Sequence, residues 1–225
     1  NQVSLLFEAA VAGGIPIIKT LKNDIFLNNV KKISGILNGT TNYILTTMEN
    51  QNKSFNEVLD DAKERGFTSD NESKLDIGGY DAAHKLTLLS TIAFGGNIDF
   101  NLNQIEGIEK ITIEDINFVK HLGFRIKLIS ECFLIDKMIY SSTKPKLIPL
   151  DKPLANVNGA LNAINVETDQ LENLYLEGEG AGGLATASSI LSDIFEISNN
   201  SNYRSIGYNI NDLKVYQKFD SSNLE

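Results

Sequence analysis

The feature that most constrains this chain is a glycine pair followed by a long apolar helix, between residues 76 and 94. Gly78 and Gly79 break the backbone, and the apolar run behind them lasts about four helical turns. At about 100° per residue, Asp81 and Lys85 lie roughly 40° apart on one face of this helix. The same face carries most of the apolar side chains: Ala82, Leu86, Leu88, Leu89, Ile92 and Ala93. The charged pair is therefore predicted to lie within the apolar stripe, with the polar side chains opposite: His84, Thr87, Ser90 and Thr91.

This placement leaves two interpretations of the Asp81–Lys85 pair. An Asp and a Lys four residues apart on a helix usually form a surface ion pair, worth only a few tenths of a kcal/mol. Inside an apolar stripe, the pair must instead be desolvated or line a cleft. A buried lysine is costly unless it is paired, and its pKa then shifts readily, which suits proton transfer. The periodicity favours a functional Lys85.

The composition excludes several classes of function. The 225-residue chain has a net charge of −9, and no Lys or Arg cluster offsets it, which argues against a nucleic-acid surface. No apolar run approaches the length of a membrane span. The single cysteine, Cys132, cannot form an internal disulfide and fits a reducing compartment. We expect a cytoplasmic protein with one large domain or two small ones.

The amino-terminal segment combines a carboxylate with a tight turn. Residues 3–7 are predicted to form a strand, Glu8 follows, and Gly13 and Gly14 force a turn before Ile15. A strand that begins almost at residue 1 leads us to expect the continuation of a longer protein. A carboxylate beside converging backbone carbonyls suits an alkali or alkaline-earth cation. A plain strand-to-helix turn explains the same residues without a cation, and the spacing alone favours it.

Residues 30–45 predict a strand, a glycine turn and the start of a helix. Asn38 or Thr40 can cap that helix. The turn at Gly39 would then present free N–H groups and hydroxyls to an anion or a polar ligand. Capping needs no ligand and is the stronger interpretation on local evidence.

The segment before the glycine pair is rich in carboxylates. An amphipathic helix is predicted over 55–65, with Gly66 as its carboxyl-terminal cap. A polar loop then leads back to the glycine pair and brings four carboxylates close together in sequence: Asp70, Glu72, Asp76 and Asp81. They form either a solvated loop or the receptor for the ammonium group of a small molecule.

The rest of the chain alternates short strands with helices. Strands are predicted over 105–111, 125–131, 137–142, 159–166 and 171–177, and helices over 113–122 and 186–197. Pro145, Pro149 and Pro153 are expected in a loop. Glycines at 178–183 are a weak phosphate-cradle signal, because no βαβ unit surrounds them. We predict an α+β fold, a mixed β-sheet covered mainly on one face by helices, whose other, apolar face and open edges are covered in a homodimer.

Four collinear motifs resemble a known family of enzymes. They read FEAAVAGGIPI at 7–17, NGTTNYIL at 38–45, DIGGYDAAHK at 76–85 and GAGGLATAS at 180–188. In this order and at these spacings they resemble homoserine dehydrogenase. The resemblance implies a catalytic and dimerisation domain over residues 1–200. Residues 201–225 would be a carboxyl-terminal segment that could return toward the nucleotide-binding domain, which in this family precedes the first motif and which this chain lacks.

The resemblance also implies roles for individual residues. Lys85 would be the general acid/base, oriented by Asp81, which would also help to hold the substrate. Asp76 would lie near the substrate ammonium, and Gly39 and Thr40 would line the pocket. A sodium ion would be bound by the carboxylate of Glu8 and by three carbonyls, those of Val11, Gly13 and Ile15. Gly66 and Gly182 would approach the NADP or NAD cofactor.

One loop departs from the family pattern. The family usually has a Glu followed by an Asp-Pro pair between Gly66 and Asp76, whereas this loop is one residue longer and has no proline. The substrate-binding Glu of the family then aligns with Ser69 or Asp70, and Glu72 could serve after a shift. We assign the role to Asp70.

Three functions are consistent with these observations. The resemblance implies an NAD(P)-dependent oxidoreductase that interconverts L-homoserine and L-aspartate 4-semialdehyde, in the biosynthesis of threonine, methionine and isoleucine. Alternatively, the chain is a non-catalytic module for dimerisation or small-molecule binding. A third interpretation, motivated by the altered acidic loop, is a related semialdehyde dehydrogenase of different specificity. The sequence does not distinguish NAD from NADP, because the residues that read the ribose lie in the half that the chain lacks.

Overall fold

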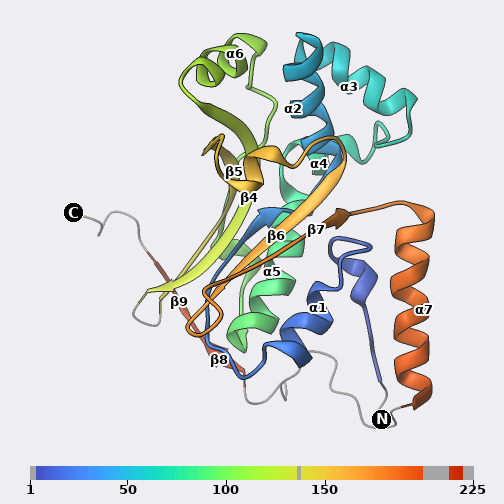
Figure 1. Cartoon of the computed structure of the whole chain (residues 1–225), viewed down its shortest axis with the longest axis vertical. Coiled ribbons are helices and arrows are strands. Elements are labelled where there is room, and N and C mark those ends of the chain that lie inside the picture. Colours follow the sequence, from blue (N-terminus) through green and yellow to red (C-terminus); the bar gives the residue numbers. More distant parts are fainter. Residues whose placement is uncertain (1–3, 136–137, 200–212, 220–225) are drawn as a thin grey trace.

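The computed structural model describes residues 4–135, 138–199 and 213–219. A seven-stranded mixed sheet has the order β3-β5-β4-β1-β6-β7, with β9 also paired to β5 (Figure 1). Its strands are β1 (Val30–Ile36), β3 (Asn103–Ile105), β4 (Phe124–Ile135), β5 (Met138–Pro149), β6 (Leu161–Thr168), β7 (Asn173–Glu179) and β9 (Gln217–Lys218). The pairs from β5 to β7 are antiparallel, and β3 and β9 run parallel to β5. A small second sheet joins β2 (Gly96–Asn97) to β8 (Lys214–Val215).

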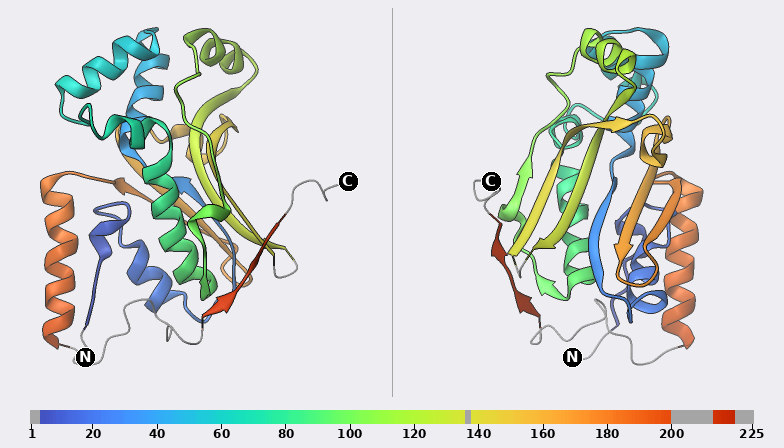
Figure 2. Two further views of the ribbon diagram at one scale, coloured as in Figure 1. Left: turned by 180° about the vertical axis from the view of Figure 1, so that it is seen from behind. Right: turned by 60° about the vertical axis from the view of Figure 1, so that its left-hand side comes forward.

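The helices lie mainly on one side of the sheet. They are α1 (Ile17–Lys19), α2 (Gly39–Gln51), α3 (Phe55–Glu64), α4 (Ser73–Ile77), α5 (Tyr80–Phe94), α6 (Ile113–His121) and α7 (Gly183–Asn199). Figure 2 shows α5 running along one sheet face, with α2, α3 and α4 above it. The core forms where Leu86 and Leu89 of α5 pack, fully buried, in one cluster with Ile33 of β1. The predicted α+β fold with helices mainly on one face is confirmed.

The opposite face of the sheet is not the apolar surface that we predicted. Its apolar cluster is small and is centred on Ile36 and Ile129, with Val157 packed onto it. Along the same face, Glu131 of β4 forms ion pairs with Lys32 and Lys146. The alternation of β4 therefore places charged side chains, and not a continuous apolar layer, on this side.

Several predicted strands have different limits in the structure. Residues 4–7 form no strand, and Val3 lies outside the described residues. Only the beginning of the predicted 105–111 strand pairs, because the chain then leaves the sheet and the Ile108 N–H donates to the Ile77 carbonyl at 2.8 Å. Pro145 and Pro149 lie within β5 and not in a loop. Proline is tolerated there because β3 pairs only with the Ser141–Thr143 part of that edge.

The described part of the carboxyl-terminal segment packs onto the same domain. Strand β9 pairs in parallel with the start of β5, at Met138 and Ile139. The Tyr216 hydroxyl donates to the Phe94 carbonyl at 2.8 Å. Most of the segment predicted over 201–225 lies outside the described residues. Among the helices that the structure describes, none has the length and apolar character needed to cross a bilayer.

Candidate active site

A cavity of about 790 Å³ lies where three of the four sequence motifs, those at 38–45, 76–85 and 180–188, approach one another. One wall is the start of α2, with Asn38, Gly39 and Thr40. A second wall comes from the acidic loop and the start of α5, and a third from Ala160, Leu161 and the glycine segment 179–182. Residues that are far apart in the sequence therefore share one pocket.

Lys85 lies in the wall of this cavity and is held by two acceptors. Its Nζ donates to Asp81 Oδ2 at 2.7 Å and to the Leu37 carbonyl at 3.2 Å. The side chains of Lys85 and Asp81 are 21% and 32% exposed, and both line the cavity, so the pair is partly exposed within the cavity wall. The helical periodicity located this pair correctly. The apolar face that it predicted was wrong at two positions, because Leu88 is exposed and Ser90 is buried.

Asn38 joins the two carboxylates of the site. Its amide nitrogen donates to Asp76 Oδ1 at 2.8 Å and to Asp81 Oδ2 at 2.9 Å. Its amide oxygen accepts the Thr41 N–H at 2.8 Å, which caps α2. The sequence predicted only the cap. Its two hydrogen bonds to the carboxylates depend on tertiary contacts with α4 and with the start of α5, which no local pattern reveals.

Burial dominates the electrostatics of Asp76. Its desolvation raises the pKa of the carboxyl group, and the nearby negative charge of Asp81 raises it further. Hydrogen bonds from Asn38 and from the Thr68 hydroxyl, which donates to Asp76 Oδ2 at 2.7 Å, oppose that shift. A ligand ammonium at this point would relieve the repulsion between the two carboxylates.

The acidic loop places Glu72, and not Asp70, beside the cavity. The Asp70 side chain is 87% exposed and pairs with Lys63 at 2.8 Å, away from the pocket. Glu72 lines the cavity and accepts a hydrogen bond from the Ser69 hydroxyl at 2.8 Å. Residues 70–72 form a turn before α4, in which the Glu72 N–H donates to the Ser69 carbonyl at 3.1 Å, and this turn separates the directions of Asp70 and Glu72.

The two glycines assigned to the cofactor both line the cavity. Gly66 has a φ of +76° and Gly182 a φ of +109°, conformations that residues with a side chain rarely adopt. Thr40 and Gly39 also line it, and the Thr40 hydroxyl donates to the Phe67 carbonyl at 2.9 Å. Arg65 and Glu179 line the cavity as well, and no sequence motif pointed to them.

The Ala160–Leu161 wall is fixed by a buried lysine. Lys127 donates from Nζ to Asn42 Oδ1 at 2.9 Å and to the Val157 carbonyl at 2.5 Å. The Asn42 amide in turn donates to the Leu161 carbonyl at 3.1 Å. Burial lowers the pKa of the Lys127 ammonium to about 8. This network connects β4 to α2 and holds the wall against the start of that helix.

A family model described as homoserine dehydrogenase matches residues 16–195. The chain belongs to the homoserine dehydrogenase family. It is 42% identical over 198 residues to the homoserine dehydrogenase of Neisseria gonorrhoeae, an alignment that covers 88% of this chain and 45% of that protein. The Helicobacter pylori enzyme is 42% identical over 204 residues, with 90% and 48% covered. The chain thus spans about half the length of the curated relatives that it matches.

Solved homoserine dehydrogenase structures have the same fold. The crystal structure from Thiobacillus denitrificans superposes with a TM-score of 0.85 at 37% identity and covers 94% of this chain and 51% of that one. A hyperthermophilic archaeal homoserine dehydrogenase mutant in complex with NADPH gives a TM-score of 0.70 at 29% identity, with 88% and 57% covered.

In the turn that the family resemblance assigned to sodium, the Glu8 carboxylate also holds the start of α1. The Glu8 oxygens accept the N–H groups of Ile18 at 2.8 Å and Lys19 at 2.9 Å, so the side chain serves the first turn of α1. The Gly13 and Ile15 carbonyls each accept one hydrogen bond, from the Ser189 hydroxyl and the Ile17 N–H. Each of these oxygens, on the carboxylate and on the carbonyls alike, accepts one hydrogen bond and retains a further lone pair, so the bonds do not exclude a cation.

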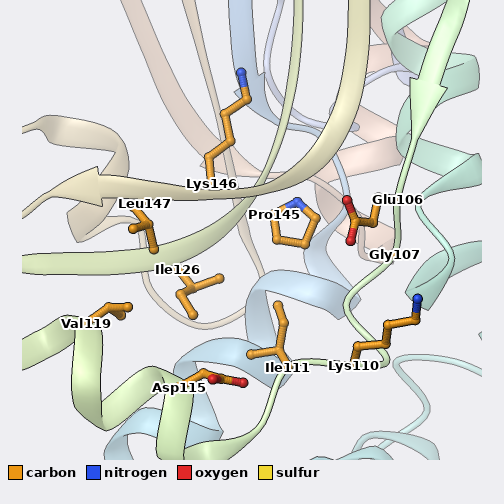
Figure 3. A pocket seen from close by; sticks show the side chains of 10 residues that line it. All are labelled: Glu106, Gly107, Lys110, Ile111, Asp115, Val119, Ile126, Pro145, Lys146 and Leu147. Carbon is orange, nitrogen blue, oxygen red and sulfur yellow. The ribbon is translucent and has the colours of Figure 1, made fainter.

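A second cavity, of about 290 Å³, lies away from these residues (Figure 3). Ile111, Val119, Ile126 and Leu147 give it an apolar floor, and Lys146 points away from it. Among the residues that line it, none belongs to the predicted site. The larger cavity is therefore the candidate active site.

Proposed function

We propose that this chain supplies the substrate-binding and proton-transfer half of an NAD(P)-dependent oxidoreductase that interconverts L-homoserine and L-aspartate 4-semialdehyde. Membership of the homoserine dehydrogenase family supports the reaction. The observation that carries the proposal is the Lys85 ammonium, held 2.7 Å from Asp81 in a cavity that Asp76 and Glu72 also line.

Each of these residues has a chemical role in the proposed reaction. The bound nicotinamide supplies or accepts the hydride. In the reducing direction Lys85 donates its proton to the aldehyde oxygen as that atom gains negative charge. Asp81 and the Leu37 carbonyl keep the ammonium pointed into the cavity.

The amino-acid part of the substrate has complementary partners in the same cavity. Asp76 and Glu72 attract the substrate ammonium. The first turn of a helix leaves its N–H groups without intrahelical partners. The Asn38 side chain already satisfies the Thr41 N–H, so the N–H groups at Gly39 and Thr40 are the candidates for the substrate carboxylate.

Turnover by the intact protein tests this proposal. We expect oxidation of L-homoserine with NADP⁺ or NAD⁺, followed by absorbance of the reduced cofactor, and the reverse reaction with aspartate 4-semialdehyde. L-Serine and other amino alcohols are the comparison substrates. Preference for one of these over homoserine would favour a semialdehyde dehydrogenase of altered specificity, and no turnover of any would favour a non-catalytic module.

The acidic loop gives a separate prediction. Glu72→Gln should raise the KM for homoserine by about tenfold or more, because it removes a charge from the cavity wall. Asp70→Asn, at an exposed position paired with Lys63, is the matched control and should leave KM within about twofold. A larger effect from Asp70→Asn than from Glu72→Gln would restore the assignment that we made from the sequence alone.

We also propose a sodium ion bound in the 8–15 turn by the Glu8 carboxylate and by the carbonyl oxygens of Val11, Gly13 and Ile15. The turn adjoins the cavity, because the Gly14 N–H donates to the Glu179 carbonyl at 2.9 Å. Replacing Na⁺ by choline at constant ionic strength should then reduce turnover and lower the melting temperature. Identical values in both salts would rule the ion out.

A homodimer and a cytoplasmic location complete the proposal. The sheet face opposite the helices supports the dimer, since Phe133 and Tyr140 stack on it at 4.7 Å between centroids beside Lys32 and Lys144. Sedimentation of the intact protein should give twice the monomer mass. The single cysteine, buried at Cys132, supports a reducing compartment.

A further inference from the structure

Asn162 is a buried amide without a hydrogen-bond partner. It lies on β6, is 1% exposed, and both its Oδ1 and its Nδ2 lack a partner. On the same strand face, Ile164 and Val166 are fully buried and apolar. An unsatisfied buried polar group costs about 1–3 kcal/mol, so an apolar residue here would be more stable. An amide kept at this position therefore needs an explanation beyond packing.

The amide lies directly beneath the wall of the larger cavity. A Cβ atom added to Gly180 would come within 2.1 Å of Asn162 Cγ, so the amide rests flat against the backbone of Gly180. A Cβ atom on Gly39 would lie 3.6 Å from Asn162 Oδ1. Gly39 and Gly180 both line the cavity. The amide thus sits between the start of α2 and the glycine segment that contains Gly182.

The chemistry of the amide differs from that of the rest of the cavity. Asp76, Asp81 and Lys85 match the charged groups and the reacting oxygen of an amino-acid substrate. Asn162 is neutral and offers both a donor and an acceptor. The group that complements it with one donor and one acceptor is another carboxamide, and the nicotinamide ring carries one.

We propose that Asn162 is a specificity-determining residue that receives the carboxamide of the nicotinamide ring. This inference rests on the function proposed above. Contact requires residues 180–182 to move off the amide. Ala181 and Gly182 are exposed, and glycines at both 180 and 182 give this short segment unusual backbone freedom.

Kinetics of Asn162→Leu in the intact protein test the proposal. Leucine has the same number and branching of side-chain heavy atoms and removes both hydrogen-bonding atoms. We expect the KM for NADP⁺ or NAD⁺ to rise by about tenfold, while the KM for homoserine changes by less than threefold. Asn165→Leu is the matched control, because that amide lies on the same strand and bonds Asn173 at an exposed position. It should leave both constants unchanged.

A cofactor analogue provides a second measurement that a structural role would not affect. Replacing the carboxamide by an acetyl group, as in 3-acetylpyridine dinucleotides, keeps the acceptor and removes the donor. The intact protein should prefer the natural cofactor by about tenfold in kcat/KM after correction for the analogue's different reduction potential. Asn162→Leu should lose that preference.

Four other results would overturn the assignment of Asn162 to the nicotinamide carboxamide. Equal use of both cofactors by the unmodified protein overturns the inference without any variant, so it stays testable if Asn162→Leu does not fold. A change confined to the melting temperature also overturns it, because a buried water would then satisfy the amide. A rise in the homoserine KM alone would assign Asn162 to the substrate hydroxyl instead. Absence of any homoserine turnover would reject the proposed function itself, and the inference with it.

Discussion

Replacing Lys85 by methionine should lower kcat by at least ~1,000-fold and leave the fold intact. General acid–base catalysis alone contributes ~100–10,000-fold, and the ammonium also stabilises the developing oxyanion. Methionine preserves the length and apolar stem of lysine. Stability should change little, because the ion pair with Asp81 is partly solvent-exposed at both ends. Single-turnover kinetics and thermal unfolding of the intact protein measure the two effects separately.

Two further variants control this prediction. Lys63→Met removes the ion pair with Asp70 on the far side of the acidic loop and should leave turnover unchanged. Lys85→Arg keeps a positive charge but holds its proton too tightly to transfer it, so it should recover binding without recovering kcat. If Lys85→Met retained kcat within tenfold of the unmodified protein, the proton would have to come from elsewhere.

Local patterns predicted those parts of the site that lie on one regular element. The 3.6-residue period of α5 placed Asp81 and Lys85 on its cavity-facing side, as the structure confirms. Gly66 was correctly expected after α3, because a helix end favours a residue with positive φ. These features depend only on residues within a few positions of one another, which is why the sequence alone suffices.

Where a position depends on an irregular segment, the sequence was less informative. The structure places Glu72 beside the cavity and Asp70 in solvent, because the turn at residues 70–72 sets the directions of the loop side chains; the substrate-binding role of Asp70 stays a prediction. Asn38 was expected only as a cap, since its bonds to Asp76 and Asp81 span about forty residues of sequence. No local pattern singles out Asn162 on its apolar strand face, because Gly39 and Gly180, which enclose its amide, lie far from it in the sequence.

The contact between Asn38 and the two carboxylates leads to the second large prediction. Asn38→Asp should destabilise the protein by roughly 3–5 kcal/mol at pH 8, since two hydrogen bonds to charged groups are worth about 1.5–3 kcal/mol each. It also replaces a donor by a third negative charge between Asp76 and Asp81. Turnover should fall at least ~100-fold, because Asp81 then no longer orients Lys85.

The pH dependence of that loss separates charge repulsion from a simple packing defect. Crowded carboxylates have pKa values in the folded state above those of the unfolded chain, as burial already causes at Asp76. The folded variant then binds more protons than the unfolded chain, so its stability falls as pH rises through this range and recovers as pH falls toward 5. Urea unfolding at pH 5 and pH 8 measures the difference. Asn56→Asp adds the same charge at an exposed position of α3 and should show no such recovery. A deficit for Asn38→Asp that is equal at both pH values would mean that the three side chains do not share one electrostatic site.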